Sequence, residues 1–128
     1  MGFEILTLDG RRGVLAHVDI RSPVSVGKYR VNLHDLENVA VSAIRDAVTA
    51  GGLVVIDEIG PMEIASVSFR QAVMAALESK STVLGSIVQR STPFTDQIKR
   101  LPQVTLIELT SVNREAMVDQ IIRLLSPV

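Results

Sequence analysis

The stretch Leu53-Val54-Val55-Ile56-Asp57-Glu58 decides the fold of this 128-residue chain. Four aliphatic residues in a row predict a strand that is buried on both faces, as the strands of parallel sheets are. The two acids that follow mark the point where this strand reaches the surface. Because ligands of open α/β sheets bind outside the carboxyl ends of the strands, Asp57 and Glu58 are the first candidates for chemistry.

Helical and strand patterns alternate on the C-terminal side of this stretch. An amphipathic helix is expected from Ser68 onward, and an apolar strand over Thr82–Val88 follows it. Thr92-Pro93 is typical of a helix start, and Val104–Leu109 is expected to be a further strand. Asn113 is placed to cap a last helix. The face that this helix is expected to bury carries Met117, Val118, Ile121, Ile122 and Leu125.

Strand patterns dominate the N-terminal side of the chain. Phe3 and Ile5 alternate with other residues, and Asp9–Gly13 is a cluster of turn residues. Val14–Val18 is the next strand pattern, so this region predicts a β-hairpin. Val26–Val31 is expected to be a further short strand.

A helix is expected to follow these strands. Asn32 is its expected N-cap, and Asp35 stands three residues later in a pattern that resembles a capping box. Apolar residues recur at helical spacing until Gly51-Gly52 supplies the stop. The order after residue 32 is therefore αβαβαβα. This order predicts an α/β fold with a mostly parallel sheet covered by helices, and with an antiparallel hairpin at the N-terminal end.

Composition limits the classes of protein to which the chain can belong. With 47% hydrophobic residues, 21% charged residues and a net charge of −1, the 128 residues fit one packed domain with an aliphatic core, since aromatic residues make up only 3%. No run of basic residues is interleaved with aromatic ones, so neither nucleic acid nor a membrane is expected as a partner. No apolar stretch approaches the ~20 residues that span a bilayer. Zero cysteines exclude a thiolate nucleophile and predict a reducing, cytoplasmic compartment.

The strand that ends in Asp57-Glu58 has the form of a Walker B strand. In such a strand the first acid holds Mg²⁺, usually through water, and the second orients or deprotonates the attacking water. The alternative is that the two acids only solvate the end of a strand. Short motifs of this kind also occur by chance, so the hexamer alone leaves both interpretations open.

Three further residues are candidates for contact with a nucleotide. Arg90 follows the strand over Thr82–Val88, where a guanidinium can reach a γ-phosphate and stabilise charge in the transition state. A solvated arginine before a capped helix is the alternative. Asn113 and Arg114 are candidates for contact with a base or ribose, although a helix N-cap also explains Asn113.

A Walker B strand works together with a phosphate loop of the form Gly-x4-Gly-Lys-Ser/Thr, and the 128 residues contain no such motif. The nearest string is Ser22-Pro23-Val24-Ser25-Val26-Gly27-Lys28-Tyr29. It has serine where the first glycine belongs and tyrosine where the hydroxyl ligand of Mg²⁺ belongs. A turn that leads into a strand is the simpler interpretation of this string.

Several strings, taken in order along nearly the whole chain, resemble the cancer-related or thermophile-type family of P-loop nucleoside-triphosphatases. They are Thr7–Arg11, Leu15–Val18, Val26–Leu33, Val54–Glu63, Ser91–Phe94 and Thr110–Arg114. The resemblance implies a RecA-like three-layer α/β/α fold and Mg²⁺-dependent hydrolysis of ATP, GTP and other nucleoside triphosphates. Asp57 and Glu58 match the family's catalytic acids, and Arg90 and Asn113 match in string.

The resemblance also implies a departure from the family. In the family, a phosphate-loop strand and helix and a second strand precede the hairpin, whereas this chain has Met1 where the hairpin begins. Residues 1–128 are therefore expected to be the C-terminal portion of a P-loop domain, truncated before the hairpin and without Walker A. Three interpretations stay open: a nucleoside-triphosphatase in shortened form, a remnant that binds nucleotide or a partner without hydrolysis, and an unrelated α/β module.

The implied strand order leads to an expectation about assembly. In that order the phosphate-loop strand lies between Thr82–Val88 and Val104–Leu109. Without it, two rows of backbone donors and acceptors would stay unpaired, at ~1–3 kcal/mol for each buried group. Either these two strands pair directly with each other, or another chain covers the exposed surface. A homo-oligomer is the expected outcome.

Overall fold

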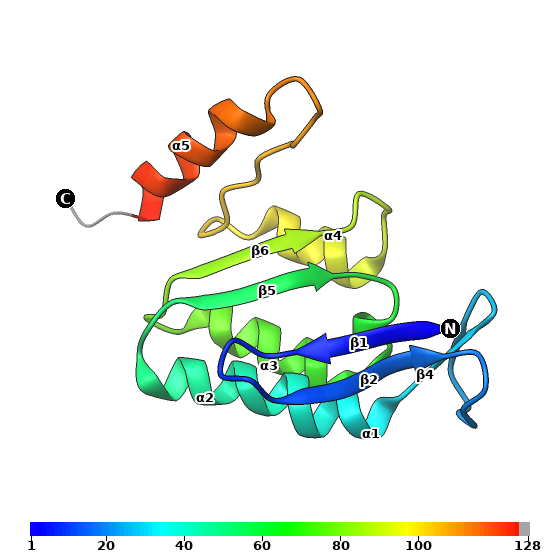
Figure 1. Cartoon of the computed structure of the whole chain (residues 1–128). Coiled ribbons are helices and arrows are strands. Elements are labelled where there is room, and N and C mark those ends of the chain that lie inside the picture. Colours follow the sequence, from blue (N-terminus) through cyan, green and yellow to red (C-terminus); the bar gives the residue numbers. More distant parts are fainter. Residues whose placement is uncertain (126–128) are drawn as a thin grey trace.

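The computed structural model describes residues 1–125, which form two small sheets, a layer of helices beneath them and an outlying C-terminal helix (Figure 1). The strands are β1 Gly2–Leu6, β2 Arg12–His17, β3 Ser25–Val26, β4 Tyr29–Val31, β5 Val54–Ile59 and β6 Val83–Ile87. The helical elements are α1 Leu33–Asp35, the π-helical segment η1 Leu36–Val41, α2 Ser42–Ala50, the 3₁₀ turn η2 Glu63–Ala65, α3 Val67–Glu78, α4 Pro93–Arg100 and α5 Arg114–Leu125.

The first sheet is antiparallel throughout, with the strand order β1-β2-β4-β3. The predicted N-terminal hairpin is confirmed as β1 and β2, with a register shift between Phe3 and Glu4. The single strand expected over Val26–Val31 is wrong, because the chain turns back within it. Gly27, with φ of 59°, lies in this turn between β3 and β4, in a region of backbone space that glycine enters without a steric penalty.

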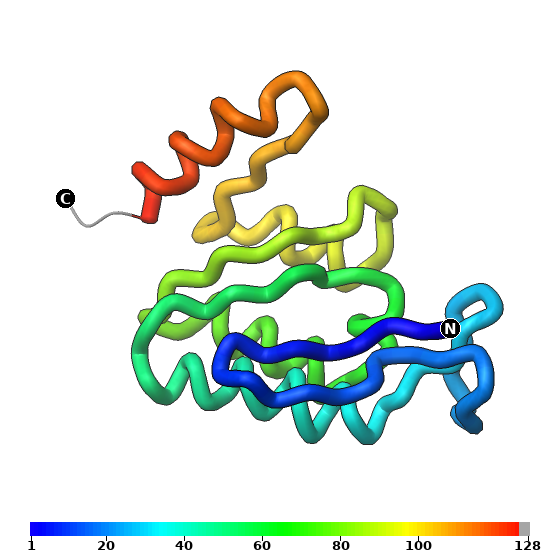
Figure 2. Tube along the Cα trace, in the orientation of Figure 1, coloured from blue at the N-terminus to red at the C-terminus, as the bar shows by residue number. Residues whose placement is uncertain are grey.

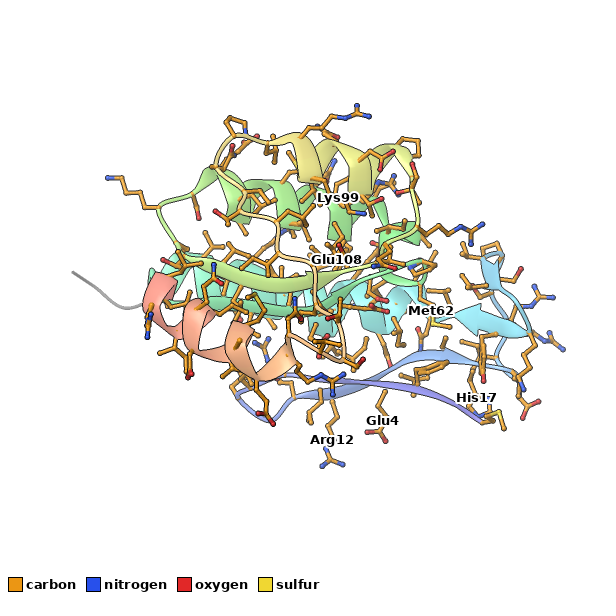
Figure 3. All side chains as sticks on the ribbon, turned by 90° about the horizontal axis from the view of Figure 1, so that it is seen from above. Glu4, Arg12, His17, Met62, Lys99 and Glu108 are labelled. Carbon is orange, nitrogen blue, oxygen red and sulfur yellow. The ribbon has the colours of Figure 1, made fainter. Side chains whose placement is uncertain are left out.

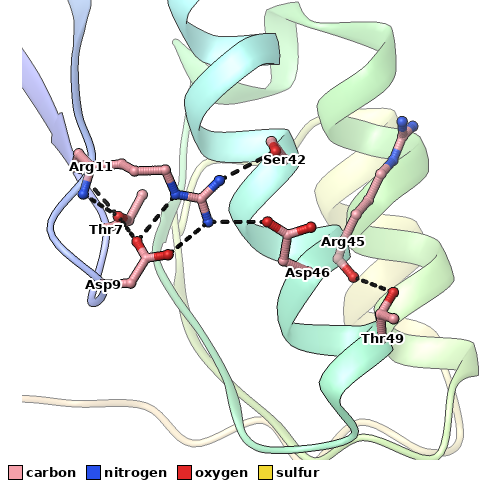
Figure 4. Close-up of polar contacts among 7 residues, drawn as sticks. All are labelled: Thr7, Asp9, Arg11, Ser42, Arg45, Asp46 and Thr49. Atoms are coloured by element: carbon pink, nitrogen blue, oxygen red, sulfur yellow. Dashed lines mark hydrogen bonds and ion pairs between the residues drawn. The ribbon is translucent and has the colours of Figure 1, made fainter.

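The tip of the hairpin is fastened to α2 by Arg11 (Figure 4). Its guanidinium forms ion pairs with Asp9 at 3.0 Å and with Asp46 at 3.3 Å, and it donates a hydrogen bond to Ser42 Oγ at 3.3 Å. The hydrogen bond from Arg11, with another from Thr7, lowers the pKa of Asp9 to about 2. This network fixes where β1 runs relative to the helices, although exposed ion pairs contribute little stability individually.

The helical stretch from Leu33 to Ala50 begins and ends where the sequence predicts. Asn32 Oδ1 accepts a hydrogen bond from Asp35 N at 3.0 Å, and Gly51 ends α2 in the left-handed conformation, with φ of 75°. The Asp35 carboxylate does not complete a capping box. It accepts a hydrogen bond from Val14 N at 2.8 Å instead, which ties this helical stretch to β2.

The predicted parallel pairing of the decisive strand is confirmed, since β5 pairs with β6 in parallel. Its predicted burial on both faces is wrong. Val54, Ile56 and Ile59 are buried, whereas Val55 remains 42% exposed. The reason is that the helices lie beneath one face of the sheet that contains β5 (Figure 1), and that within residues 1–125 no strand pairs with the second edge of β5. The described part of the chain therefore has one parallel pair rather than a mostly parallel, three-layer arrangement.

The core lies between β5 and the helices. Its members are almost all aliphatic, as the composition predicts, and Phe69 is the one fully buried aromatic side chain of the described residues. Phe69 lies in α3, which begins earlier than the sequence suggests. Ser66, rather than Ser68, is the N-cap, and its hydroxyl accepts a hydrogen bond from Phe69 N at 3.1 Å.

The C-terminal region departs most from expectation (Figure 2). Val104–Leu109 forms no strand. The direct pairing of this segment with β6, one of the two outcomes expected from the sequence, is therefore wrong. Helix α5 forms where predicted but buries none of its residues, and Val118 is 51% exposed. An apolar segment becomes a strand only beside a neighbour with free backbone groups, and sequence alone does not supply that neighbour.

Of the helices described in residues 1–125, none combines the length and the apolar character needed to cross a membrane.

Candidate functional site

The carboxyl ends of β5 and β6 lie side by side, because the two strands run in parallel. Asp57 lies near the end of β5, and its Oδ1 atom accepts a hydrogen bond of 2.5 Å from the hydroxyl of Ser86 in β6. Beyond this contact, Val88 N donates to Ile59 O at 3.1 Å. The position of the Asp57 carboxylate is therefore fixed by the neighbouring strand.

Glu58 folds back against Gly60. The peptide bond between Asp57 and Glu58 is cis, and Gly60 is buried. A Cβ atom on Gly60 would stand only 2.8 Å from Glu58 Oε1 and 3.1 Å from its Cδ. Gly60 does not have a positive φ, so the backbone itself does not demand glycine here. The missing side chain instead leaves the space that the Glu58 carboxyl group occupies.

Glu63 is an acid that the sequence analysis did not single out. It lies in η2, five residues after Glu58, and burial raises its pKa to about 7. The charges of Glu58 and Asp57 raise this pKa as well, whereas hydrogen bonds from the backbone of Glu63 and Gly60 lower it. The string Met62-Glu63 is visible in the sequence, but the burial that perturbs this carboxyl group depends on tertiary packing.

A cavity of about 880 Å³ separates the first sheet from β5. Asp57, Glu58 and Glu63 line it on one side, and Ile5 of β1 lies on the other. Met62, another lining residue, is labelled in Figure 3 beside the space between β5 and β1. The candidate acids thus share one recess with apolar walls.

The segment after β6 is fixed by α4. Lys99 Nζ donates hydrogen bonds to the carbonyl oxygens of Val88 at 2.9 Å and Gln89 at 3.3 Å (Lys99 is labelled in Figure 3). Thr95 Oγ1 donates to Arg90 O at 3.3 Å. The backbone of Arg90 is therefore fixed, while its side chain is exposed. Sequence reasoning missed Lys99, because a lysine in the last turn of a helix is common for electrostatic reasons alone.

Asn113 and Arg114 lie at the start of α5. The Asn113 side chain accepts a hydrogen bond from Thr110 N at 2.7 Å and donates one to Glu108 O at 2.9 Å, so it stabilises its own loop. Arg114 is exposed. Within residues 1–125, no hydrogen bond or ion pair joins Arg90, Asn113 or Arg114 to the acids of β5. The structure thus brings the predicted Asp57 into contact with Ser86, which the sequence analysis did not name, and among the described residues it leaves Arg90, Asn113 and Arg114 without a hydrogen bond or ion pair to the acids of β5.

The described residues fit a Mg²⁺ ion only if the phosphates of a bound substrate help to hold it. Across residues 1–125, no group of three or more His, Cys, Asp or Glu side chains converges in a way that could hold a metal ion. Mg²⁺ does not require such a cage, because it keeps several waters and commonly binds through one or two carboxylates together with substrate phosphates. Asp57, oriented by Ser86, suits that mode of binding.

The chain is similar to proteins whose family is known. A family model described as NTPase matches residues 1–122. The nucleoside-triphosphatase THEP1 of Thermotoga maritima is 41% identical over 125 residues, which cover 98% of this chain and 72% of that protein. The nucleoside-triphosphatase THEP1 of Methanosarcina acetivorans is 52% identical over 84 residues, which cover 65% of this chain and 47% of that protein.

The fold is similar to that of a solved relative. The crystal structure of THEP1 from the hyperthermophile Aquifex aeolicus matches with a TM-score of 0.91 and 32% sequence identity. The match covers 98% of this chain and 77% of that chain. The arrangement of sheets and helices described above therefore has a counterpart in a solved protein.

Proposed function

The chain belongs to this NTPase family, and from that premise we propose that the protein hydrolyses ATP, GTP and other nucleoside triphosphates to the diphosphate and phosphate, with Mg²⁺. Its α/β fold is that of a P-loop NTPase. The observation that carries the proposal is the position of Asp57 and Glu58 at the carboxyl end of a parallel strand, inside the matched span, with Asp57 held by Ser86.

Each acid has a distinct proposed role. Asp57 holds Mg²⁺ through water, and the ion, when bound, neutralises charge on the β- and γ-phosphates. Glu58 accepts a proton from the attacking water, whose oxygen forms the new bond to the γ-phosphorus as the bond from that phosphorus to the bridging oxygen of the leaving diphosphate breaks.

Three residues outside the cluster complete the proposed site. Arg90 stabilises the charge that develops on the γ-phosphate, and Asn113 and Arg114 contact the base or ribose. The fixed backbone of Arg90 and its exposed guanidinium support the first role. The second role requires the Asn113 amide to exchange its two loop contacts for contacts with a nucleotide.

We further propose that residues 1–128 alone hydrolyse nucleotides very slowly. They contain no Gly-x4-Gly-Lys-Ser/Thr motif, so no oriented amides and lysine surround the β- and γ-phosphates. Electrostatic contributions of this kind are commonly worth ~10²–10³-fold each. Asp57 and Glu58 cannot replace them, because they carry charge of the opposite sign.

Phosphate release from ATP and GTP tests both parts of the proposal. Residues 1–128 are compared with the same residues preceded by a phosphate-loop strand and helix, each with and without Mg²⁺. We expect hydrolysis by the extended protein only, and its loss in Glu58→Gln. Fast Mg²⁺-dependent release by residues 1–128 that Glu58→Gln abolishes would overturn the predicted inactivity. An inactive extended protein that still binds nucleotide would overturn the proposed hydrolysis.

A second candidate function is a non-catalytic module that binds nucleotide or protein and forms a homo-oligomer. The observation that favours it is the unpaired second edge of β5, near which Leu53 and Val55 are 48% and 42% exposed. Exposed strand edges are sites where another chain can add. Sedimentation at micromolar concentration distinguishes a monomer from a homo-oligomer, and a stable monomer would exclude the oligomer.

A further inference from the structure

The loop that follows β6 turns its carbonyl oxygens toward α4. Lys99 Nζ donates hydrogen bonds to Val88 O at 2.9 Å and to Gln89 O at 3.3 Å. The hydroxyl group of Thr95, a fully buried residue of α4, donates to Arg90 O at 3.3 Å. Side chains of one helix therefore hold three successive carbonyl groups on the same side of the loop.

The opposite side of this loop carries the N–H groups of the same peptide units. In a planar trans peptide the N–H bond points away from the C=O bond, and the one cis peptide bond of the described residues lies between Asp57 and Glu58. The N–H groups of Gln89, Arg90 and Ser91 therefore point away from α4. Within residues 1–125, none of these three N–H groups donates a hydrogen bond. All three residues are exposed, so a ligand can approach the donors.

We propose that this loop, residues 88–91, binds phosphate, and that Lys99 and Thr95 are positioning residues that hold its N–H donors outward. Successive backbone N–H groups that point to one side form concavities that bind anions. A phosphate group offers three strong acceptor oxygens to these three donors. The inference rests on the proposed function, because the phosphate that it assigns to the loop is the terminal phosphate of a nucleoside triphosphate.

The place of the loop in the fold suits this phosphate. The loop continues from β6, where the Ser86 hydroxyl group holds the Asp57 carboxylate. Val88 N donates to Ile59 O at 3.1 Å, which joins the start of the loop to the end of β5. The free N–H groups and the proposed metal-binding acid therefore belong to the same edge of the parallel strand pair.

The charges around the loop favour an anion. Among residues 1–125, the acid in hydrogen-bond contact with the loop is Asp96 of α4, which accepts a bond of 2.5 Å from the Ser91 hydroxyl group. The Lys99 ammonium group, on the same helix, carries the opposite charge. The Arg90 guanidinium is exposed in the middle of the loop, so one positive charge remains in excess.

Amide NMR of residues 1–128, titrated with inorganic phosphate at constant pH and ionic strength, tests the inference. We expect the amide signals of Gln89, Arg90 and Ser91 to shift in a saturable way, because their N–H groups gain a charged acceptor. Chloride at the same ionic strength is the control for screening. Inorganic phosphate lacks the base and the ribose, so its effect does not depend on how the rest of a nucleotide is bound.

Three variants test the role of Lys99. Lys99→Met removes the ammonium group and keeps a long unbranched side chain, and we expect it to bind phosphate ~10-fold more weakly, because the donors are no longer held on one side. Lys99→Arg keeps donors at this position, so we expect it to bind more tightly than Lys99→Met. Arg100→Met is the matched control: Arg100 is the next residue of α4, is exposed, and forms no hydrogen bond or ion pair with other residues in 1–125. Loss of its charge should change the affinity by less than ~2-fold.

Each part of the inference has its own contrary result. Amide signals of the loop that do not respond to phosphate, or that respond equally to chloride, would overturn the phosphate site, and the parent protein alone decides this point. Equal affinity in Lys99→Met and Arg100→Met, or in Lys99→Met and Lys99→Arg, would overturn the positioning role of Lys99. Urea unfolding verifies that the variants are folded. Absence of hydrolysis in the extended protein overturns the proposed function, whereas the phosphate titration of residues 1–128 requires no hydrolysis.

Discussion

Ser86 donates a hydrogen bond of 2.5 Å to Asp57 Oδ1, across the pairing of β5 and β6. This contact orders the side chain of the proposed metal-binding acid before any ion arrives. One carboxylate oxygen is held by the hydroxyl group, and Oδ2 has no hydrogen bond to other residues in 1–125. The carboxylate thus presents its second oxygen in a fixed direction, as residues that support metal ligands commonly arrange.

Ser86→Ala is expected to weaken divalent-cation binding by ~10–100-fold, the usual cost of losing a residue that orients a metal ligand. Binding is measured in the presence of ATP, by Mn²⁺-induced broadening of the amide signals of Asp57 and Glu58. Ser111→Ala is the matched control, because Ser111 is exposed and makes no hydrogen bond with other described residues. Equal affinity in the two variants would show that Ser86 does not support the site.

Gly60→Ala is expected to displace Glu58 without unfolding the chain. The added Cβ would stand 2.8 Å from Glu58 Oε1, which is the free end of a flexible side chain, so the carboxyl group moves rather than the backbone. The carboxyl carbon of Glu58 should shift in the NMR spectrum, while the free energy of unfolding changes by less than ~0.5 kcal/mol. A large loss of stability would mean that Gly60 is required by packing instead.

Glu63 should make stability depend on pH. Its pKa rises from 4.5 to about 7 on folding, so the folded state binds more protons between these values. The resulting stability is complete below pH 4.5 and is lost as the pH rises through 7. Because the carboxyl group is partly exposed, the loss is ~1–2 kcal/mol rather than the full value of the shift.

Urea unfolding at pH 5 and pH 8 measures this dependence. Glu63→Gln stays neutral, so we expect it to lose less stability than the parent between the two pH values, and to be the more stable protein at pH 8. Asp9 and Asp35 have lowered pKa values and contribute equally to both proteins, so the comparison cancels their effects. Parallel pH dependence in parent and variant would contradict a raised pKa for Glu63.

Thr92→Ala is expected to destabilise the protein by ~1 kcal/mol, the usual cost of a lost N-cap. Thr92 Oγ1 accepts a hydrogen bond from Thr95 N at 3.1 Å, and Thr95 Oγ1 accepts one from Thr92 N at 3.1 Å, so α4 has a complete reciprocal cap. Thr49→Ala, at an exposed position of α2, is the control, with an expected change below ~0.5 kcal/mol. Chemical denaturation measures the free energy of unfolding of both variants.

Local features of the fold were predictable because they depend on neighbouring residues. Asn32 and Thr92 cap their helices as expected, Gly51 ends α2, and the apolar run before Asp57 forms a strand. Each of these features depends on residues that are only a few positions apart in the sequence. The turn at Gly27 was missed because a single glycine is also compatible with an extended strand.

Features that depend on distant partners were not predictable. Val104–Leu109 has the pattern of a strand but no neighbour to pair with, and Val55 is apolar yet exposed. In the site, the acids of β5 follow from the motif, whereas Ser86, Lys99 and the burial of Glu63 arise from tertiary contacts. The homo-oligomer, the cytoplasmic location and the nucleotide contacts of Arg90, Asn113 and Arg114 stay predictions.

Helices α3 and α5 each contain 12 residues, yet α3 buries four of them and α5 buries none. An isolated helix of this length is only marginally stable in water, so backbone hydrogen bonds alone give α5 little protection. Its amides should therefore exchange with deuterium through frequent local opening, whereas those of α3 should exchange only when the whole domain unfolds. A ligand or second chain that covers α5 would reveal itself by slowing the exchange of this helix first.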